Sequence, residues 1–173
     1  RRPRAEAGSP PTRTAAREHT VAAREGVMDE SVLYSESFAI AGGDFEHGGE
    51  TAARVKAVMR EFGLPGDSVR RLSIANFEAE MNVIMYAREA RLDFVVTSGE
   101  VRVTVEDSGP GIPDLGLAMQ EGYSTATPEM RARGFGAGMG LPNIKAQADA
   151  MEIESEPGQG VKMRLVFEMR ANP

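Results

Sequence analysis

The sequence has 173 residues, of which 41% are hydrophobic, and a formal net charge of −6; this length and composition suit one globular domain with its own core. It contains no cysteine, which excludes disulfides and thiolate metal sites. No apolar run approaches the ~20 residues of a membrane span, and the first residues lack the apolar segment of a signal peptide. A cytoplasmic protein is therefore expected.

The charge is unevenly distributed along the chain. Residues 1–27 carry a net charge of +3 and the remainder carries −9; an acidic body argues against nucleic-acid binding as the main task. Residues 1–30 are rich in Arg, Ala and Pro and have few large apolar side chains, which predicts a disordered basic tail outside the core. The folded domain is expected over residues 31–170.

Periodic apolar residues predict alternating helices and strands after this tail. The expected strands are 35–41, 91–97, 101–107, 152–156 and 161–169. The expected helices are 50–62, 67–87 (capped by Asp67 or Ser68), 112–120 and 141–150. Residues 121–140 form a glycine-bearing loop that is too long for a simple connection, so we expect it to be functional. The predicted fold is α+β: a two-layer α/β sandwich with a mixed, mostly antiparallel sheet and helices on one face.

The first of three motifs is Glu78-Ala-Glu-Met-Asn82. In a helix, Glu78 and Asn82 lie on one face about one turn apart. The amide oxygen of Asn82 can bind Mg²⁺ without adding charge beside phosphates, and the Glu78 carboxylate can accept a proton as a catalytic base. Any isolated pair of this spacing would be interpreted as exposed helix residues, but the two later motifs support the functional interpretation.

The second motif is Asp107-Ser-Gly109-Pro-Gly111, followed by Ile112. Asp107 ends an apolar strand and can accept a hydrogen bond from the amino group of adenine. Gly109 and Gly111 let the backbone turn and pass close to a ligand. The alternative is an ordinary turn after a strand.

The third motif reads Gly134-Phe-Gly136-Ala-Gly138-Met139-Gly140-Leu141. Glycine-rich backbone that leads into a helix N-terminus binds phosphate, because free N–H groups point at the anion. The dinucleotide fingerprint spacing, the Walker loop and the protein-kinase motif set are absent. The three motifs together predict ATP and Mg²⁺ as ligands, with the glycines forming a mobile lid.

These motifs resemble the GHKL (Bergerat-fold) ATPase and kinase superfamily, whose ATP-binding fold DNA gyrase and histidine kinases share. The similarity covers roughly residues 33 to 168. Within it, Gly122-Tyr-Ser124-Thr125 and the Gly136–Lys145 stretch resemble the anti-sigma factor serine/threonine kinase branch. The resemblance implies a regulatory protein as partner, either an anti-sigma antagonist or a protein like a sigma factor, and it allows a homodimer.

The resemblance also suggests roles for three residues of the loop. Arg133 occupies the position of a lid arginine that reaches the terminal phosphate in this branch; an exposed surface charge is the alternative. Ser124 and Thr125 are either phosphate contacts or ordinary loop polar residues.

One departure from the family pattern concerns the final hairpin. The family usually has Gly-x-Gly-Thr there, and the Thr hydroxyl helps the aspartate to recognise adenine. Here Gly158-Gln-Gly160 is followed by Val161. This contact is therefore lost, or another donor replaces the hydroxyl.

The leading functional hypothesis is a serine/threonine protein kinase that phosphorylates a small regulatory protein to control partner switching. A second hypothesis is a non-catalytic, ATP-dependent binding switch whose lid is ordered by the γ-phosphate. A third is a detached ATPase domain of a histidine kinase. The third is less favoured, because residues 1–30 are Pro-rich and show no long helix around a phospho-accepting His.

Overall fold

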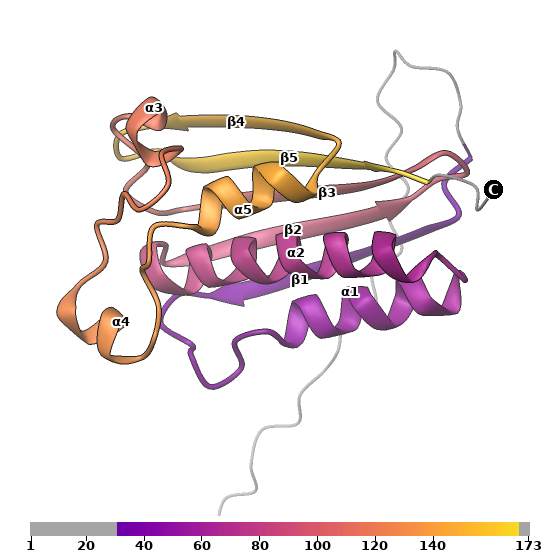
Figure 1. The fold of residues 1–173 in the computed structure, drawn as a ribbon, viewed down its shortest axis with the longest axis horizontal. Helices are drawn as coiled ribbons and strands as arrows, with labels where there is room; N and C mark the ends of the chain where they lie inside the picture. The colour runs from indigo at the N-terminus through magenta and orange to yellow at the C-terminus, as the bar shows by residue number, and fades with distance from the viewer. Residues whose placement is uncertain (1–30, 170–173) are drawn as a thin grey trace, which may run out of the picture.

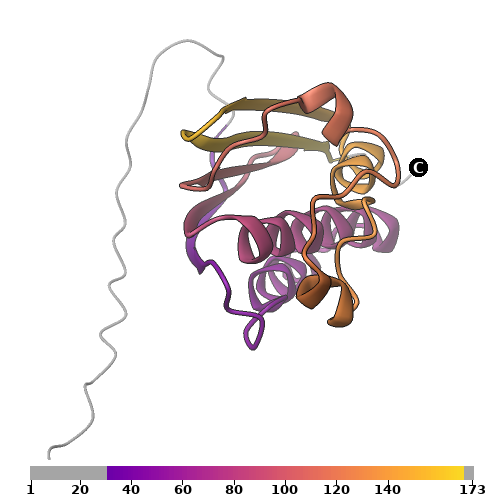
Figure 2. The ribbon, with the colours of Figure 1, turned by 90° about the vertical axis from the view of Figure 1, so that its left-hand side faces the viewer.

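The structure is a computed structural model that describes residues 31–169. The predicted tail at residues 1–30 lies outside the described residues. Between residues 31 and 169, no helix is long and apolar enough to cross a membrane. The described chain folds as two layers, a five-stranded sheet with α1, α2 and α5 on one of its faces (Figures 1 and 2), in agreement with the predicted α+β sandwich. The elements in chain order are β1 (Tyr34–Ala41), α1 (Glu50–Glu61), α2 (Gly66–Tyr86), β2 (Glu89–Val96), β3 (Glu100–Asp107), α3 (Leu115–Ala118), α4 (Pro128–Ala132), α5 (Gly140–Gln147), β4 (Ala150–Glu156) and β5 (Gly160–Glu168).

The strand order in the sheet is β1-β2-β3-β5-β4. All four neighbouring pairs are antiparallel, whereas the sequence predicted a mixed, mostly antiparallel sheet. The reason lies in the last hairpin. The chain crosses from β3 through α3, α4 and α5 to β4, which runs parallel to β3. However, β5 lies between these two strands, so no parallel pair is adjacent.

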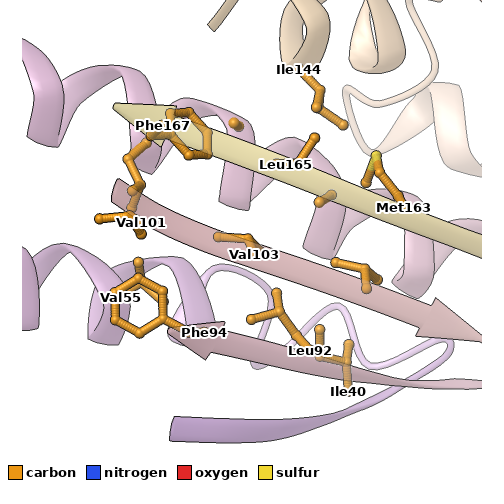
Figure 3. Close-up of a cluster of buried hydrophobic side chains, with 14 of the residues drawn as sticks. Ile40, Val55, Leu92, Phe94, Val101, Val103, Ile144, Met163, Leu165 and Phe167 are labelled. Atoms are coloured by element: carbon orange, nitrogen blue, oxygen red, sulfur yellow. The ribbon is translucent and has the colours of Figure 1, made fainter. Parts of the chain in front are cut away.

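The core lies between the sheet and the helices. In β2 and β3, alternate residues are buried and face the helical layer, as the period of two along a strand requires. Figure 3 shows Val55 of α1 beside Phe94 of β2, and Ile144 of α5 over Leu165 of β5; Val55 and Ile144 are both fully buried. Burial of each large aliphatic or aromatic side chain contributes about 1.5–3 kcal/mol. The buried residues of the two strands are Ala90, Leu92, Phe94, Val96, Val101, Val103 and Val105.

Two helices differ from the prediction at their ends. Helix α2 begins at Gly66 after Pro65 and has no side-chain cap, so the predicted cap at Asp67 or Ser68 is wrong. The fixed φ of Pro65 suits the residue that precedes a helix. Helix α5 ends at Gln147, because Ala148 is already extended and leads into β4.

The long loop contains more regular structure than expected. The predicted helix at 112–120 is only the four-residue α3, in which Asp114 accepts a hydrogen bond from the Leu117 N–H at 2.9 Å. A further short helix, α4, interrupts the predicted loop 121–140. It begins with Pro128 behind Thr127, whose hydroxyl accepts a hydrogen bond from the Met130 N–H. Capping residues at both starts explain why such short helices form.

A buried carboxylate joins α2 to α1. Helix α1 follows Gly49 and has no side-chain cap of its own. Instead, Glu80 of α2, only 2% exposed, accepts hydrogen bonds from the N–H groups of Thr51 at 3.1 Å and Ala52 at 2.9 Å. These N–H groups have no partner inside their helix, and the positive end of the helix dipole favours an anion there. Glu80 therefore fixes α1 onto α2.

Replacing Glu80 with Gln is expected to lower the free energy of unfolding by about 1.5–3 kcal/mol, the value of hydrogen bonds to a charged group. The amide presents a donor to one N–H that needs an acceptor. Urea unfolding measures the change, and Glu61→Gln at the exposed end of α1 is the matched control. Equal unfolding midpoints for the two variants would contradict the role of Glu80.

Candidate nucleotide-binding site

A cavity of about 540 Å³ lies between α2, the end of β3, the segment 122–140 and the β4–β5 hairpin. In Figure 1, the end of α2, the end of β3 and the segment from α3 to α5 gather at the same end of the molecule. The volume is typical of small-molecule sites, which span roughly 300–1,000 Å³. All predicted site residues except Gly109 and Arg133 line it. Those that do are Glu78, Asn82, Asp107, Gly111, Ile112, Ser124, Thr125, Gly134, Gly136, Gly138, Met139, Gly140 and Leu141.

Asp107, the last residue of β3, is held by two backbone N–H groups. Its Oδ1 accepts hydrogen bonds from Gly109 at 2.7 Å and from Val161 at 3.2 Å. Both of these bonds go to one oxygen, so Oδ2 can accept a hydrogen bond from a ligand amino group. Gly109 thus acts behind the carboxylate rather than in the cavity wall. The backbone of Val161 supplies a donor to the carboxylate at the position where the family has threonine.

Two glycines allow the final hairpin to approach this carboxylate. A Cβ on Gly160 would lie 2.0 Å from the Asp107 carbonyl oxygen, and one on Gly111 would lie 2.2 Å from the Glu156 carbonyl oxygen. Both glycines also have positive φ angles, which other residues rarely adopt. No other residue fits either position without displacing the backbone.

Ser155 of β4 connects the second motif to the hairpin, and the sequence analysis missed it. Its hydroxyl accepts a hydrogen bond from the Ile112 N–H at 2.7 Å and donates one to the Gly160 carbonyl at 2.9 Å. The sequence feature that could have revealed Ser155 is its place in β4: it follows Met151 and Ile153 on the face of the strand that points to the core, and it is polar. Ser155 thereby fixes Ile112 beside the cavity.

Glu78 and Asn82 extend from one face of α2 into the cavity, as their spacing predicted. Glu78 Oε1 accepts a hydrogen bond from Nδ2 of Asn143 in α5 at 2.7 Å. Asn143 is a second residue that the sequence analysis missed. Its amide donor opposite a carboxylate gives Glu78 a defined orientation.

Asn82 faces the start of α5. A Cβ on Gly140 would lie 3.0 Å from Asn82 Oδ1, so glycine leaves this oxygen accessible. Within residues 31–169, no group of three or more His, Cys, Asp or Glu side chains could hold a metal ion. The accessible Asn82 oxygen alone would fit Mg²⁺, which binds one or two protein oxygens and completes its shell with water and substrate phosphates.

The glycine-rich segment 122–140, the lid, folds onto itself. The Gly122 N–H donates a hydrogen bond to the Gly138 carbonyl at 2.9 Å, and a Cβ on Gly136 would lie 2.1 Å from Ala126 Cβ. Ser124 Oγ accepts a hydrogen bond from the Ala126 N–H at 3.1 Å. This turn brings Ser124 and Thr125 into the cavity wall beside the lid glycines.

Arg133 lies outside the cavity wall. Its guanidinium carbon is 4.8 Å from the ring centroid of Phe45, in the loop between β1 and α1. Phe135 also contacts Phe45, with 5.9 Å between ring centroids. Phe45, Arg133 and Phe135 form what we call the lid clasp. The structure therefore places the arginine on an aromatic ring, and its predicted phosphate contact stays a prediction.

Comparison with known proteins identifies the family. The model of the histidine kinase-like ATPase domain matches residues 43–166. The chain belongs to this family. The predicted superfamily is thus confirmed, and membership of an ATPase-domain family means that the chain uses ATP.

Two relatives of this ATPase domain agree with the predicted branch. The chain is 29% identical over 117 residues to the serine/threonine-protein kinase RsbT of Bacillus subtilis, covering 65% of this chain and 82% of that protein. It is 30% identical over 104 residues to the anti-sigma F factor of Caldanaerobacter subterraneus, covering 57% of this chain and 69% of that protein. One chain of the solved SiaB–SiaC complex from Pseudomonas aeruginosa shares the fold. The match covers 80% of this chain and 92% of that chain, with a TM-score of 0.50 and 13% sequence identity.

The variant Asp107→Asn is expected to weaken ATP binding about 10- to 100-fold, because an amide cannot replace a charge-assisted acceptor worth roughly 1.5–3 kcal/mol. Calorimetry with ATP and GTP on both proteins measures the loss and the change in base preference. Glu106→Gln, which alters the neighbouring exposed carboxylate, is the control. Unchanged ATP affinity in Asp107→Asn would remove this residue from base recognition.

The variant Phe45→Ala is expected to loosen the lid clasp in nucleotide-free protein. It removes an aromatic pair and a cation–π contact, together worth about 1–2.5 kcal/mol, so amide exchange over residues 122–140 should accelerate about 5- to 70-fold where it occurs by local opening. Hydrogen exchange with mass spectrometry tests this. Phe62→Ala, at the far end of α1, is the aromatic control. Identical exchange rates in the lid of both variants would exclude the clasp as its anchor.

Proposed function

We propose that the chain is an ATP-dependent serine/threonine protein kinase of the anti-sigma regulatory type, which phosphorylates a small regulatory protein. The position of Glu78 carries the proposal: its carboxylate lines the same cavity as Asn82 and the lid glycines. A protein that only bound nucleotide would need no proton acceptor one helical turn from its metal ligand. The name of the relative RsbT, a serine/threonine-protein kinase, supports the same activity.

In the proposed reaction, the hydroxyl oxygen of a partner Ser or Thr forms a bond to the γ-phosphorus of ATP. The bond from this phosphorus to the β–γ bridging oxygen breaks, and ADP leaves. The hydroxyl proton passes to the Glu78 carboxylate, which acts as general base. Positioning and charge stabilisation supply most of the catalysis in such transfers.

The remaining residues have binding roles in this proposal. Asp107 accepts a hydrogen bond from the adenine amino group. Backbone N–H groups of the lid glycines and the first turn of α5 bind phosphate oxygens, with Ser124 and Thr125 as side-chain contacts. Asn82 would hold Mg²⁺, which when bound neutralises phosphate charge. Arg133 would leave Phe45 and approach the terminal phosphate.

The partner class follows from charge and from the relatives. The chain has a net charge of −6, which disfavours nucleic acid as a partner. Relatives are named anti-sigma F factors, which supports a regulatory protein, such as an anti-sigma antagonist or a sigma-like factor, as substrate or binding partner. The proposal places this kinase in the cytoplasm, without a membrane partner, and includes a homodimer as one assembly.

One observation favours a second candidate function. The Arg133 guanidinium lies on the Phe45 ring, away from the place where catalysis would need it. A lid that the γ-phosphate reorders could then report nucleotide state to a bound partner without phosphate transfer. This switch and the kinase make different demands on Glu78.

Two variants of α2 separate the two functions. Glu78→Gln is expected to keep Mg-ATP affinity within about threefold and to lower phosphate transfer about 10²–10⁴-fold, the usual contribution of general-base catalysis. The amide oxygen still accepts the Asn143 hydrogen bond, so the local geometry is kept. Asn82→Ala is expected to lose both Mg²⁺-dependent ATP binding and transfer.

Calorimetry with Mg-ATP and phosphorylation of a partner protein found by pull-down provide the two measurements. Glu61→Gln controls for the loss of one carboxylate elsewhere. If wild-type protein binds its partner only with ATP and never phosphorylates it, the kinase is rejected in favour of the switch.

A further inference from the structure

Asn143 occupies the first turn of α5, directly after the lid. Its backbone N–H donates a hydrogen bond to the Met139 carbonyl at 2.8 Å, which fixes the start of the helix. The next residue, Ile144, is fully buried, and α5 packs against α2. Asn143 therefore belongs to a helical turn that is anchored in the core by Ile144, and its side-chain amide lies opposite Glu78 of α2.

Asparagine is a costly choice at this position. It has low helix propensity, because its side chain competes with the backbone for hydrogen bonds. Here the side chain instead donates to Glu78 Oε1 at 2.7 Å, across 65 residues of sequence in a partly buried setting. The contact therefore serves Glu78 of α2, and it adds nothing to the stability of α5 as a helix.

The chemistry of the contact suits a proton acceptor. A free glutamate side chain has three rotatable bonds, and fixing it costs rotamer entropy. A neutral amide donor fixes one carboxylate oxygen without a salt bridge that would compete for the charge. The other oxygen, Oε2, is then directed by the fixed plane of the group and can accept a proton within hydrogen-bond reach.

The same turn of α5 also lies next to the predicted metal ligand, since a Cβ added to Gly140 would be 3.0 Å from Asn82 Oδ1. The first turn of α5, which starts at the last lid residue, therefore faces both Glu78 and Asn82 of α2, through Asn143 and Gly140. A movement of α5 would change the orientation of Glu78 and the space in front of Asn82 together.

We propose that Asn143 is a positioning residue for Glu78: it holds the carboxylate in the orientation in which Oε2 receives the hydroxyl proton, and it couples this orientation to the lid through α5. The inference rests on the proposed kinase function. Asn143 is not among the residues that line the cavity and its N–H is bonded to the Met139 carbonyl, so in this proposal its side chain acts only through Glu78.

The experiment uses Asn143→Ala and Asn143→Leu in the full chain, because Leu keeps the branched shape of Asn without its donor. For phosphate transfer, we expect kcat to fall about 10²-fold, as for a misplaced catalytic group, while the KM for ATP and Mg-ATP affinity change less than about threefold. Gln147→Ala, which removes an amide from the same helix, is the matched control and should transfer phosphate normally. Equal kcat in Asn143→Leu and wild type would overturn the proposal.

A double variant separates positioning from a general structural role. With Glu78→Gln already present, adding Asn143→Leu should lower kcat no further, because the residue acts only through the carboxylate. If the two losses multiply instead, Asn143 acts elsewhere and the proposal is rejected.

A measurement without a substrate protein keeps the inference distinct from the kinase proposal. In protein with ¹³C-labelled glutamate, the Glu78 side-chain signal should shift and broaden in Asn143→Leu, and the Glu61 signal should not. An unchanged Glu78 signal would overturn the positioning role. If wild type transfers no phosphate to any partner, the kinase proposal fails, and this signal still decides whether Asn143 orients Glu78.

Discussion

Helix α2 places Glu78 and Asn82 in the candidate site, and it packs against three neighbours at once. One side of the helix packs on the sheet, Glu80 binds the N-terminus of α1, and Glu78 and Asn82 line the cavity. Residues 78 and 80 point to different neighbours because successive positions on a helix are about 100° apart. The buried carboxylate thus fixes the rotation of α2 about its axis, and this rotation directs Glu78 and Asn82 into the cavity. A change at Glu80 would therefore affect the site without touching a ligand.

The end of the cavity at Asp107 depends on a different constraint, the close approach of backbones. Positions Gly111 and Gly160 have no room for a Cβ, so the second motif and the final hairpin meet through main-chain atoms. Ser155 and Asp107 then take N–H donors from the same small region. Because backbone donors do not depend on side-chain identity, a valine can follow Gly160 and still support the carboxylate. The family hydroxyl is therefore dispensable for holding Asp107 in place.

The parts of this structure that the sequence predicts well are those set by local periodicity. The one-turn spacing of Glu78 and Asn82 and the strand end at Asp107 follow from helix and strand geometry alone. Asn143 and Ser155 escaped prediction because their partners, Glu78 and Ile112, are 65 and 43 residues away. Helix α4 was missed because it is a single turn capped by Thr127 within a glycine-rich segment that predicted a loop. Arg133 could be placed on the lid but not oriented, since its contact with Phe45 is a tertiary one.

The position of β5 between β3 and β4 has a consequence for synthesis. A chain growing on the ribosome completes α2, β3 and the lid before the hairpin that supports Asp107 exists. Pairing of β5 with β3 joins segments about 60 residues apart in the chain, and such non-local contacts form late. Until then, the Val161 N–H is missing and the cavity lacks one wall. A ligand that needs this wall would therefore stabilise the finished domain more than a partly made chain.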